Sequence, residues 1–162
     1  MSRGLGDVYK RQIISIANKL NSWESESINF YIKQLPHNFN VEFINLKGQQ
    51  NPKISKDEAL KKESELILSK ISKHDYVVSW DQNGDQLNSE DLSRFILNCQ
   101  QNDRKIIFLI GGSFGLSDVI KNRSNKIFSA SLLTFPHRLF RLILMEQIYR
   151  AHSIITNMPY HK

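Results

Sequence analysis

A cluster of glycines behind an apolar segment is the part of this sequence whose residue types most directly suggest ligand binding. The stretch is FLIGGSFGL, residues 108–116, and its glycines are Gly111, Gly112 and Gly115. Because glycine has no side chain, a ligand can reach the main-chain N–H and C=O groups of such a turn. Leu116 and Ser117 stand where a P-loop needs Lys and then Ser or Thr, and Ile110 stands where the dinucleotide-binding pattern needs its first glycine. Both phosphate-binding motifs are therefore excluded, and the turn either contacts another class of ligand or serves the fold alone.

The C-terminal end of the chain carries side chains that can bind RNA or move a proton. Between residues 137 and 162 the only acidic side chain is Glu146. The basic side chains and histidines of this segment are His137, Arg138, Arg141, Arg150, His152, His161 and Lys162. The whole chain has 22 Lys and Arg against 16 Asp and Glu, a formal charge of +6, which modestly favours polyanionic partners such as RNA.

Composition excludes several classes of protein. The five histidines are scattered and Cys99 is the single cysteine, so the spacing of a zinc or iron site is absent and no metal is expected. The 162 residues are 40% hydrophobic and 23% charged, as in ordinary soluble proteins. Apolar stretches such as 106–110 are far shorter than the roughly 20 residues of a membrane span. We therefore expect a cytoplasmic protein with no membrane segment.

The first twelve residues, MSRGLGDVYKRQ, do not continue into the pattern that follows them. They resemble a translated sequencing-adapter fragment, and a native disordered arm or an edge segment are the alternatives. We therefore expect residues 1–12 to be a non-native or disordered leader. Residues 13–162 are expected to form a single domain, which is long enough to bury a substantial core.

Apolar runs of strand length alternate with helical patterns along the first two thirds of the chain. Strands are expected at 13–17, 41–46, 76–80 and 105–110, and amphipathic helices within 28–35, 55–72 and 88–99. Ser55 with Glu58, and Asn88 or Ser89, are the expected caps of the second and third helices. Strands separated by helices predict an α/β fold with a parallel sheet flanked by helices. Ligands bind at the C-terminal ends of such strands, so the segments after Trp80 and Ile110 are expected in one crevice.

A long helix is expected from residue 137 to about residue 155, and its apolar side chains point around most of its circumference. They are Leu139, Phe140, Leu142, Ile143, Leu144, Met145, Ile148 and Tyr149. Such a helix must be covered on more than one side. A second copy of the chain can supply that cover, which predicts a homodimer. The alternative is a single deeply buried central helix.

Four motifs in the second half of the chain, taken together, are similar to one family. They are G-G-x-x-G at 111–115, T-x-P-H at 134–137, E-x-x-Y-R-A at 146–151 and a terminal Y-H-K at 160–162. This combination resembles the ribosomal RNA large subunit methyltransferase H family of the SPOUT superfamily, and the resemblance covers residues 13–162. It implies a C-terminal trefoil knot with S-adenosyl-L-methionine bound at the knot and a homodimer packed there. The knot rests on the resemblance alone, because knotted chains are rare.

The resemblance also implies which residues hold the cofactor. A methyl donor made of adenine, ribose and an amino-acid tail needs main-chain hydrogen bonds and apolar walls, and it has no phosphate. By position in the family pattern, the cofactor residues are Trp80, Gly111, Gly112, Ser131, Leu132, Leu133, Thr134, Phe135 and Pro136. For Leu132, Leu133 and Phe135, ordinary core packing is the alternative.

The reaction of that family is methylation of N3 of a pseudouridine in large-subunit ribosomal RNA, on assembled ribosomal particles. Its substrate-contacting positions match His137, Arg150, Tyr160 and His161 here. Either histidine is a candidate base for the imide proton, Arg150 is suited to a phosphate or a developing anion, and Tyr160 is suited to stacking on a base. Each residue also has a purely structural alternative. His137 would be a neighbour of a helix N-cap, Arg150 would form an ion pair with Glu146, and Tyr160 and His161 would belong to a frayed tail.

The chain departs from the family pattern at Trp80, Asp85 and Phe114. Phe114 argues against an essential carboxylate after the glycines, and Trp80 is expected to crowd or stack on the adenosine. A non-catalytic RNA-binding or ribosome-associated module of the same fold is the alternative function. Such a module would tolerate a degraded glycine turn, whereas the turn is intact in this sequence.

Overall fold

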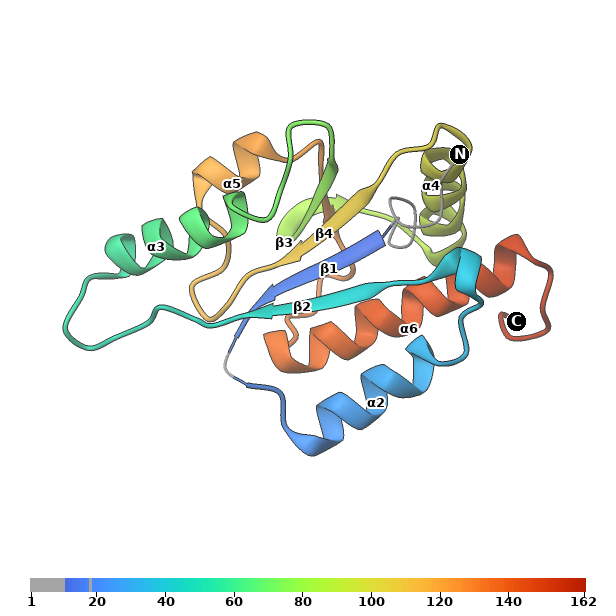
Figure 1. Cartoon of the computed structure of the whole chain (residues 1–162), viewed down its shortest axis with the longest axis horizontal. Helices are drawn as coiled ribbons and strands as arrows, with labels where there is room; N and C mark the ends of the chain where they lie inside the picture. Colours follow the sequence, from blue (N-terminus) through green and yellow to red (C-terminus); the bar gives the residue numbers. More distant parts are fainter. Residues whose placement is uncertain (1–10, 18) are drawn as a thin grey trace.

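Five parallel strands form one sheet at the centre of the computed structural model, which describes residues 11–17 and 19–162 (Figure 1). The strands are β1 (Arg11–Ile16), β2 (Glu42–Leu46), β3 (Tyr76–Gln86), β4 (Ile106–Ile110) and β5 (Lys126–Ser129). Their order across the sheet is β2-β1-β4-β3-β5. Every neighbouring pair is parallel, so the predicted parallel sheet of an α/β fold is confirmed.

The two central strands, β1 and β4, are buried along their whole length. A parallel strand with helices on both faces needs apolar side chains on both faces, and β4 is wholly apolar while β1 is apolar at residues 13, 14 and 16. In the register, Ile110 of β4 lies opposite Ser15 of β1 on one side and Trp80 of β3 on the other. The C-terminal ends of β1 and β4 therefore lie beside Trp80, inside β3.

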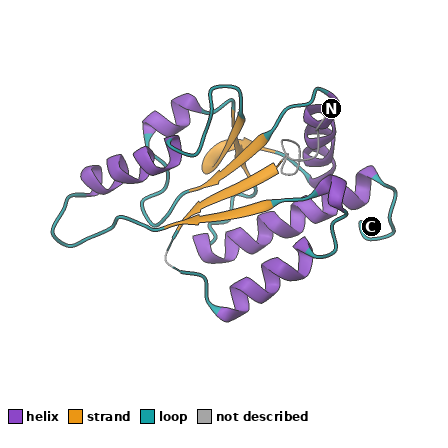
Figure 2. Cartoon of the chain, in the orientation of Figure 1, coloured by secondary structure: helices purple, strands orange, loops and turns teal. Residues whose placement is uncertain are grey.

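Helices cover both faces of the sheet (Figure 2). The helices α2 (Ser22–Ile32), α4 (Ser89–Gln101) and α6 (His137–Ile155) pack on one face, and α3 (Lys56–Leu68) and α5 (Asp118–Arg123) pack on the other. Successive strand residues point to opposite faces, so Phe108 belongs to the first core and Leu109 to the second. A short 3₁₀ turn, His37–Phe39, leads from α2 to β2.

The expected capping residues begin two of the helices. Ser55 Oγ accepts the Glu58 N–H at 3.1 Å and starts α3. Asn88, rather than Ser89, caps α4, where the Asn88 side chain accepts the Asp91 N–H at 2.7 Å and the Asp91 side chain accepts the Asn88 N–H at 3.3 Å. These bonds satisfy amide groups that have no partner inside the helix.

Three elements differ from the sequence-based expectation. β3 continues past Trp80 to Gln86 and pairs with β5 on both sides of an irregularity. Gly84 permits this close pairing, because a Cβ there would lie 2.7 Å from the carbonyl oxygen of Ile127. The patterns in the sequence predict neither β5, with four residues, nor α5, with six, because elements this short do not establish a period.

β1 begins at Arg11, two residues before the expected start of the domain. Arg11 and Gln12 pair with Ile106 and Ile107 of β4, so they belong to a central strand. Main-chain pairing does not need apolar side chains, and the Arg11 guanidinium lies 3.7 Å above the centre of the Phe39 ring. The remainder of the expected leader, residues 1–10, lies outside the described residues.

α6 occupies the expected range, and most of its apolar surface is already covered within one chain. Leu144, Met145 and Ile148 are at most 2% exposed. On the same face of the sheet, Phe30 of α2 is 61% exposed and Leu139 of α6 is 39% exposed. Apolar side chains of α2 and of the start of α6 therefore remain exposed on this face of the sheet. None of the helices described is long and apolar enough to cross a membrane.

Candidate functional site

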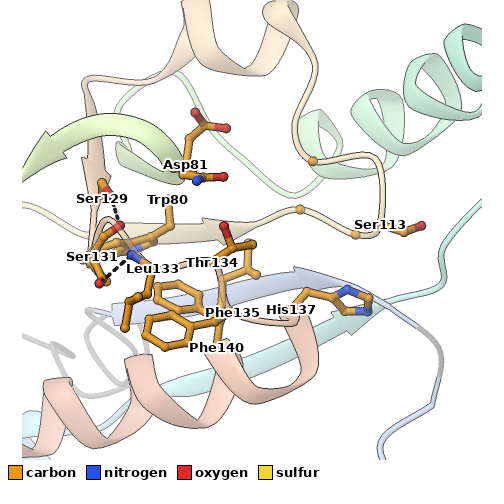
Figure 3. Close-up of a pocket in the computed structure, with 16 residues that line it drawn as sticks. Trp80, Asp81, Ser113, Ser129, Ser131, Leu133, Thr134, Phe135, His137 and Phe140 are labelled. Carbon is orange, nitrogen blue, oxygen red and sulfur yellow. Dashed lines mark hydrogen bonds between the residues drawn. The ribbon is translucent and has the colours of Figure 1, made fainter.

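A cavity of about 300 Å³ lies at the C-terminal edge of the sheet. Its walls come from residues 80–82 of β3, the end of β4, the glycine turn 111–115, the loop 129–135 and the first turn of α6 (Figure 3). Parallel sheets of this kind bind ligands at the edge where the strands end. The predicted crevice that joins the segments after Trp80 and Ile110 is confirmed.

The glycines of the turn are required by the chain itself. A Cβ on Gly111 would lie 2.4 Å from the carbonyl carbon of Gly115, and Gly115 has a φ of 74°, which favours glycine. A Cβ on Gly112 would lie 3.2 Å from the carbonyl oxygen of Ile16, at the end of β1. The missing Cβ atoms of Gly111 and Gly112 therefore face neighbouring residues, while all three glycines line the cavity.

The loop between β5 and α6 offers main-chain groups to a ligand. Among the described residues, the hydrogen bonds to its backbone are from Ser129 Oγ to the Ser131 carbonyl at 3.0 Å, from the Leu133 N–H to Ser131 Oγ at 2.9 Å, and the first bond of α6, to the Pro136 carbonyl. Figure 3 shows the two side-chain bonds as dashed lines beside the cavity. The other amide and carbonyl groups of residues 130–135 have no hydrogen-bond partner among the described residues, so an adenine edge can bond to them.

Aromatic rings form the floor of the cavity. Trp80 is 9% exposed, and its ring centre lies 5.6 Å from that of Phe140 and 5.7 Å from that of Phe128. Its indole Nε1 is buried and has no hydrogen-bond partner in the described part of the chain. Buried indole N–H groups normally find a partner. Trp80 thus adds both an apolar wall and an unused donor to this region.

Seven of the nine residues predicted for the cofactor line the cavity: Trp80, Gly111, Gly112, Ser131, Leu133, Thr134 and Phe135. Leu132 and Pro136 do not. Leu132 is 82% exposed and lines a separate surface depression beside Asn88, and Pro136 is the N-cap residue of α6. Neighbouring side chains of a loop point in different directions, so a prediction that takes every residue of a contiguous motif includes some residues that do not line the cavity.

Sequence reasoning missed several residues of the lining, among them Asp81, Gln82, Ser129 and Phe140. Asp81 and Gln82 directly follow Trp80, in the segment that the strand-end rule placed in the crevice, but the family pattern did not include them among the cofactor residues. Of the departures from the family pattern, Asp85 pairs with Phe128 of β5, and the Phe114 ring lies 5.8 Å from Lys56 Nζ. Neither belongs to the lining of this cavity.

His137, the first residue of α6, lines the cavity together with the predicted cofactor residues. Burial and then the nearby cations Arg141 and Arg138 lower the pKa of His137 below its ordinary value of 6.5, and Glu24 opposes this only in part. The imidazole is therefore neutral near pH 7. A neutral imidazole can accept a proton from a bound substrate.

Arg150, Tyr160 and His161 gather at the other end of α6. Arg150 Nη2 lies 2.8 Å from Glu146 Oε2, and Arg150 Nη1 lies 3.0 Å from His161 Nδ1. The Tyr160 hydroxyl donates to Glu146 Oε2 at 2.7 Å, and burial followed by this bond raises the pKa of Tyr160. The expected ion pair between Arg150 and Glu146 is present, and the tail is docked on α6 rather than frayed.

One chain does not bring the four predicted substrate-contacting residues together. A helix rises 1.5 Å per residue, so Arg150 lies about 20 Å along α6 from His137. His161 Nε2 also contacts Glu90 Oε1 of α4 at 2.8 Å, which holds the tail at this distant position. His137 belongs to the cavity, whereas the other three form a separate cluster. In the part of the chain that the structure describes, no group of side chains is arranged to hold a metal ion.

A protein-family model with the description "Predicted SPOUT methyltransferase" matches residues 9–161. The chain belongs to the SPOUT methyltransferase family. Among its relatives is the "Ribosomal RNA large subunit methyltransferase H" of Caldicellulosiruptor saccharolyticus, 40% identical over 152 residues, or 93% of this chain and 99% of the relative. The protein of the same name from Acholeplasma laidlawii is 38% identical over 154 residues, 94% of this chain and 99% of the relative. The resemblance seen in the sequence motifs is confirmed.

Solved structures share the SPOUT-type fold seen here. A methylase family protein from Neisseria gonorrhoeae superposes with a TM-score of 0.56 and 10% identity, covering 99% of this chain and 100% of that one. Another from Haemophilus influenzae Rd KW20 gives a TM-score of 0.53 and 11% identity, covering 96% of this chain and 71% of that one. At such identities the likeness concerns the fold alone.

Proposed function

We propose that this SPOUT methyltransferase uses S-adenosyl-L-methionine to methylate N3 of a pseudouridine in large-subunit ribosomal RNA, acting on assembled ribosomes in the cytoplasm. The relatives named for this RNA cover nearly the whole chain at about 40% identity. The observation that carries the proposal is the cavity at residues 80–82 of β3 and the end of β4, whose lining suits a nucleoside without phosphates.

The lining fits S-adenosylmethionine in three respects. Aromatic and apolar side chains flank it, and residues of the loop 130–135 that line it have main-chain groups without a partner among the described residues. No Lys or Arg of the described residues lines it. Lys and Arg are common partners of phosphate groups, whereas a cationic sulfonium disfavours them. When bound, S-adenosylmethionine supplies a methyl group on a positively charged sulfur. Trp80, Leu133 and Phe135 would hold the adenosine, and the glycine turn would border the sulfur.

The acceptor in this proposal is a weakly acidic imide nitrogen that must lose its proton as it gains the methyl group. His137 lines the cavity and is neutral near pH 7, so it can take that proton. The cavity walls fix the donor, and the substrate has to be oriented in line with it. Arg150, Tyr160 and His161 are suited to holding the RNA, through charge and stacking.

A homodimer would bring His137 of one copy close to the cluster of Arg150, Tyr160 and His161 of the other. If two copies pack with their α6 helices antiparallel, the cluster of Arg150, Tyr160 and His161 of one copy comes beside the His137 of the other. Exposed apolar side chains on α2 and α6 support such contact. We also infer the C-terminal trefoil knot, because α6 returns from the edge strand β5 to pack beside α2 while loop 129–135 runs next to the glycine turn.

Replacing Phe30 by Glu is expected to convert the dimer to monomer. Phe30 is 61% exposed on α2, so the change leaves the fold of one chain intact but places an unpaired charge in the proposed contact. Val119→Glu is the matched control, because Val119 is 58% exposed on α5, on the other face of the sheet. Analytical ultracentrifugation measures the oligomeric state of both variants. A wild-type protein that sediments as a monomer at high concentration contradicts the dimer.

The rate of methyl transfer is expected to fall only at pH values below 6.5. His137 must be neutral to accept a proton, and its lowered pKa keeps it neutral until the pH falls below that value. His137→Gln should lower kcat by about 100-fold and remove this acidic limb. The exposed His74, changed to Gln, is the control. An unchanged acidic limb in His137→Gln would assign the proton transfer to another group.

The function is tested by methyl transfer from labelled S-adenosylmethionine to ribosomes that lack the modification, with the modified nucleoside identified by mass spectrometry. Calorimetry with S-adenosylmethionine, S-adenosylhomocysteine and NAD accompanies it. Donor binding without transfer to any ribosomal particle would favour the alternative, a non-catalytic ribosome-associated module of this fold. Binding of NAD alone would contradict both the methyltransferase and the non-catalytic module.

A further inference from the structure

A second cavity, of about 440 Å³, adjoins the first at the glycine turn. Gly112, Ser113 and His137 line both cavities. The rest of its wall comes from the end of β1, the loop after β2, α3 and α6: Ile16, Ala17, Gly48, Gln50, Pro52, Glu63 and Arg138. We call it the tail cavity. The sequence motifs assign no role to its carboxylate, Glu63.

Glu63 interrupts the buried stripe of α3. Helical spacing places it between the buried Ala59 and Ile67, and it is 5% exposed. Its Oε2 accepts the Gln49 N–H at 2.8 Å. Among the described residues, its Oε1 has no hydrogen-bond partner and no cation pairs with the carboxylate. The Glu63 carboxylate therefore offers an acceptor to a cationic group that enters the tail cavity.

Hydrogen-bond donors also line the tail cavity, on Gln50 and Arg138. Gln50 Oε1 accepts the Ser113 hydroxyl, which leaves its Nε2 group to donate elsewhere. Arg138 Nη1 pairs with Glu24, and the other N–H groups of this guanidinium remain as donors. The tail cavity therefore holds one anionic acceptor together with amide and guanidinium donors, which complements a zwitterion with one ammonium and one carboxylate group.

We propose that the tail cavity binds the amino-acid end of the methyl donor, with Glu63 on the α-ammonium group and Gln50 and Arg138 on the α-carboxylate. This inference rests on the proposed function, which makes the ligand an adenosyl amino acid. The first cavity, at about 300 Å³, matches only the lower limit of cavities that enclose drug-sized ligands. It suits the nucleoside, and the chain of the donor continues past Gly112 into the adjoining space. A neutral nucleobase would leave the Glu63 charge unpaired.

The test compares two ligands that differ in the amino-acid end. S-adenosylhomocysteine carries it, and 5′-methylthioadenosine lacks it. Glu63→Gln keeps the shape of the side chain and an acceptor for the Gln49 N–H. It should lower the affinity for S-adenosylhomocysteine by about tenfold or more and leave the affinity for methylthioadenosine unchanged. Glu65→Gln, an exposed carboxylate two residues along α3, should change neither affinity. Calorimetry measures all of them.

Each other outcome overturns the inference. Equal weakening of both ligands would make Glu63 a support of the glycine turn, and unchanged binding with lost methyl transfer would assign the tail cavity to the acceptor base. An analogue of S-adenosylhomocysteine without the α-amino group, bound to the wild-type protein, should show the same tenfold loss, so the test does not depend on the folding of a variant. A wild-type protein that binds neither adenosyl ligand contradicts the proposed function itself.

Discussion

Removing residues 159–162 is expected to lower methyl transfer to ribosomes by about 100-fold or more while leaving the affinity for S-adenosylmethionine unchanged. The deletion removes Tyr160 and His161, which contact Glu146, Arg150 and Glu90. These contacts lie about 20 Å from His137 along α6, so the cavity of the same chain is not disturbed. In the proposed dimer, the tail of one copy completes the RNA-facing side of the site of the other.

The measurement combines transfer from a labelled donor to ribosomes that lack the modification with calorimetric titration of the same truncated protein. Deletion of Lys162 alone is the control, because it leaves Tyr160 and His161 in place. Tyr160→Phe separates the hydroxyl contact with Glu146 from stacking. Full activity in the truncated protein would give the tail a structural role only, and lost donor binding would contradict the separation of the two clusters.

Glu24→Ala is expected to destabilise the protein by about 3 to 5 kcal/mol, because it leaves a buried guanidinium without its counter-charge. Glu24 Oε2 lies 2.7 Å from Arg141 Nη2, and the two side chains are 1% and 0% exposed. Burial lowers the pKa of Arg141 and the Glu24 charge opposes that effect. The pair joins α2 to the start of α6, where His137 lines the cavity. Urea unfolding measures the loss.

Glu26→Ala is the control, because Glu26 lies exposed on the same helix. Its free energy of unfolding should remain within about 0.5 kcal/mol of wild type. The double variant Glu24→Leu with Arg141→Met should recover most of the lost stability, since apolar side chains of similar volume can replace a buried pair. A Glu24→Ala variant as stable as wild type would mean that solvent reaches Arg141.

The sequence alone determined the elements whose signals are local. The run at 13–17 and the apolar run of β4 predict strands buried on both faces, since the side chains of a strand alternate and apolar residues fall on both sides. The capping residues Ser55 and Asn88 set the starts of α3 and α4, because the side chain that satisfies the first amides lies next to them in the chain. The combined motifs identified the family.

Only the tertiary structure decided what depends on segments that are distant in the sequence. β5 has four residues, and it is a strand because β3 extends past Gly84 to pair with it. The side of Gly112 that lacks a Cβ faces Ile16, which no motif around residue 112 reveals.

The positions of the charged groups were also decided by tertiary packing. In the sequence, Glu63 is one of several carboxylates on α3. Its burial against the loop after β2 depends on how α3 packs on the sheet. Arg150 and His137 share one helix, yet the length of that helix keeps them about 20 Å apart. Periodicity and caps are set by neighbours along the chain, whereas burial and juxtaposition are set by pairing between strands and helices that the sequence order leaves open.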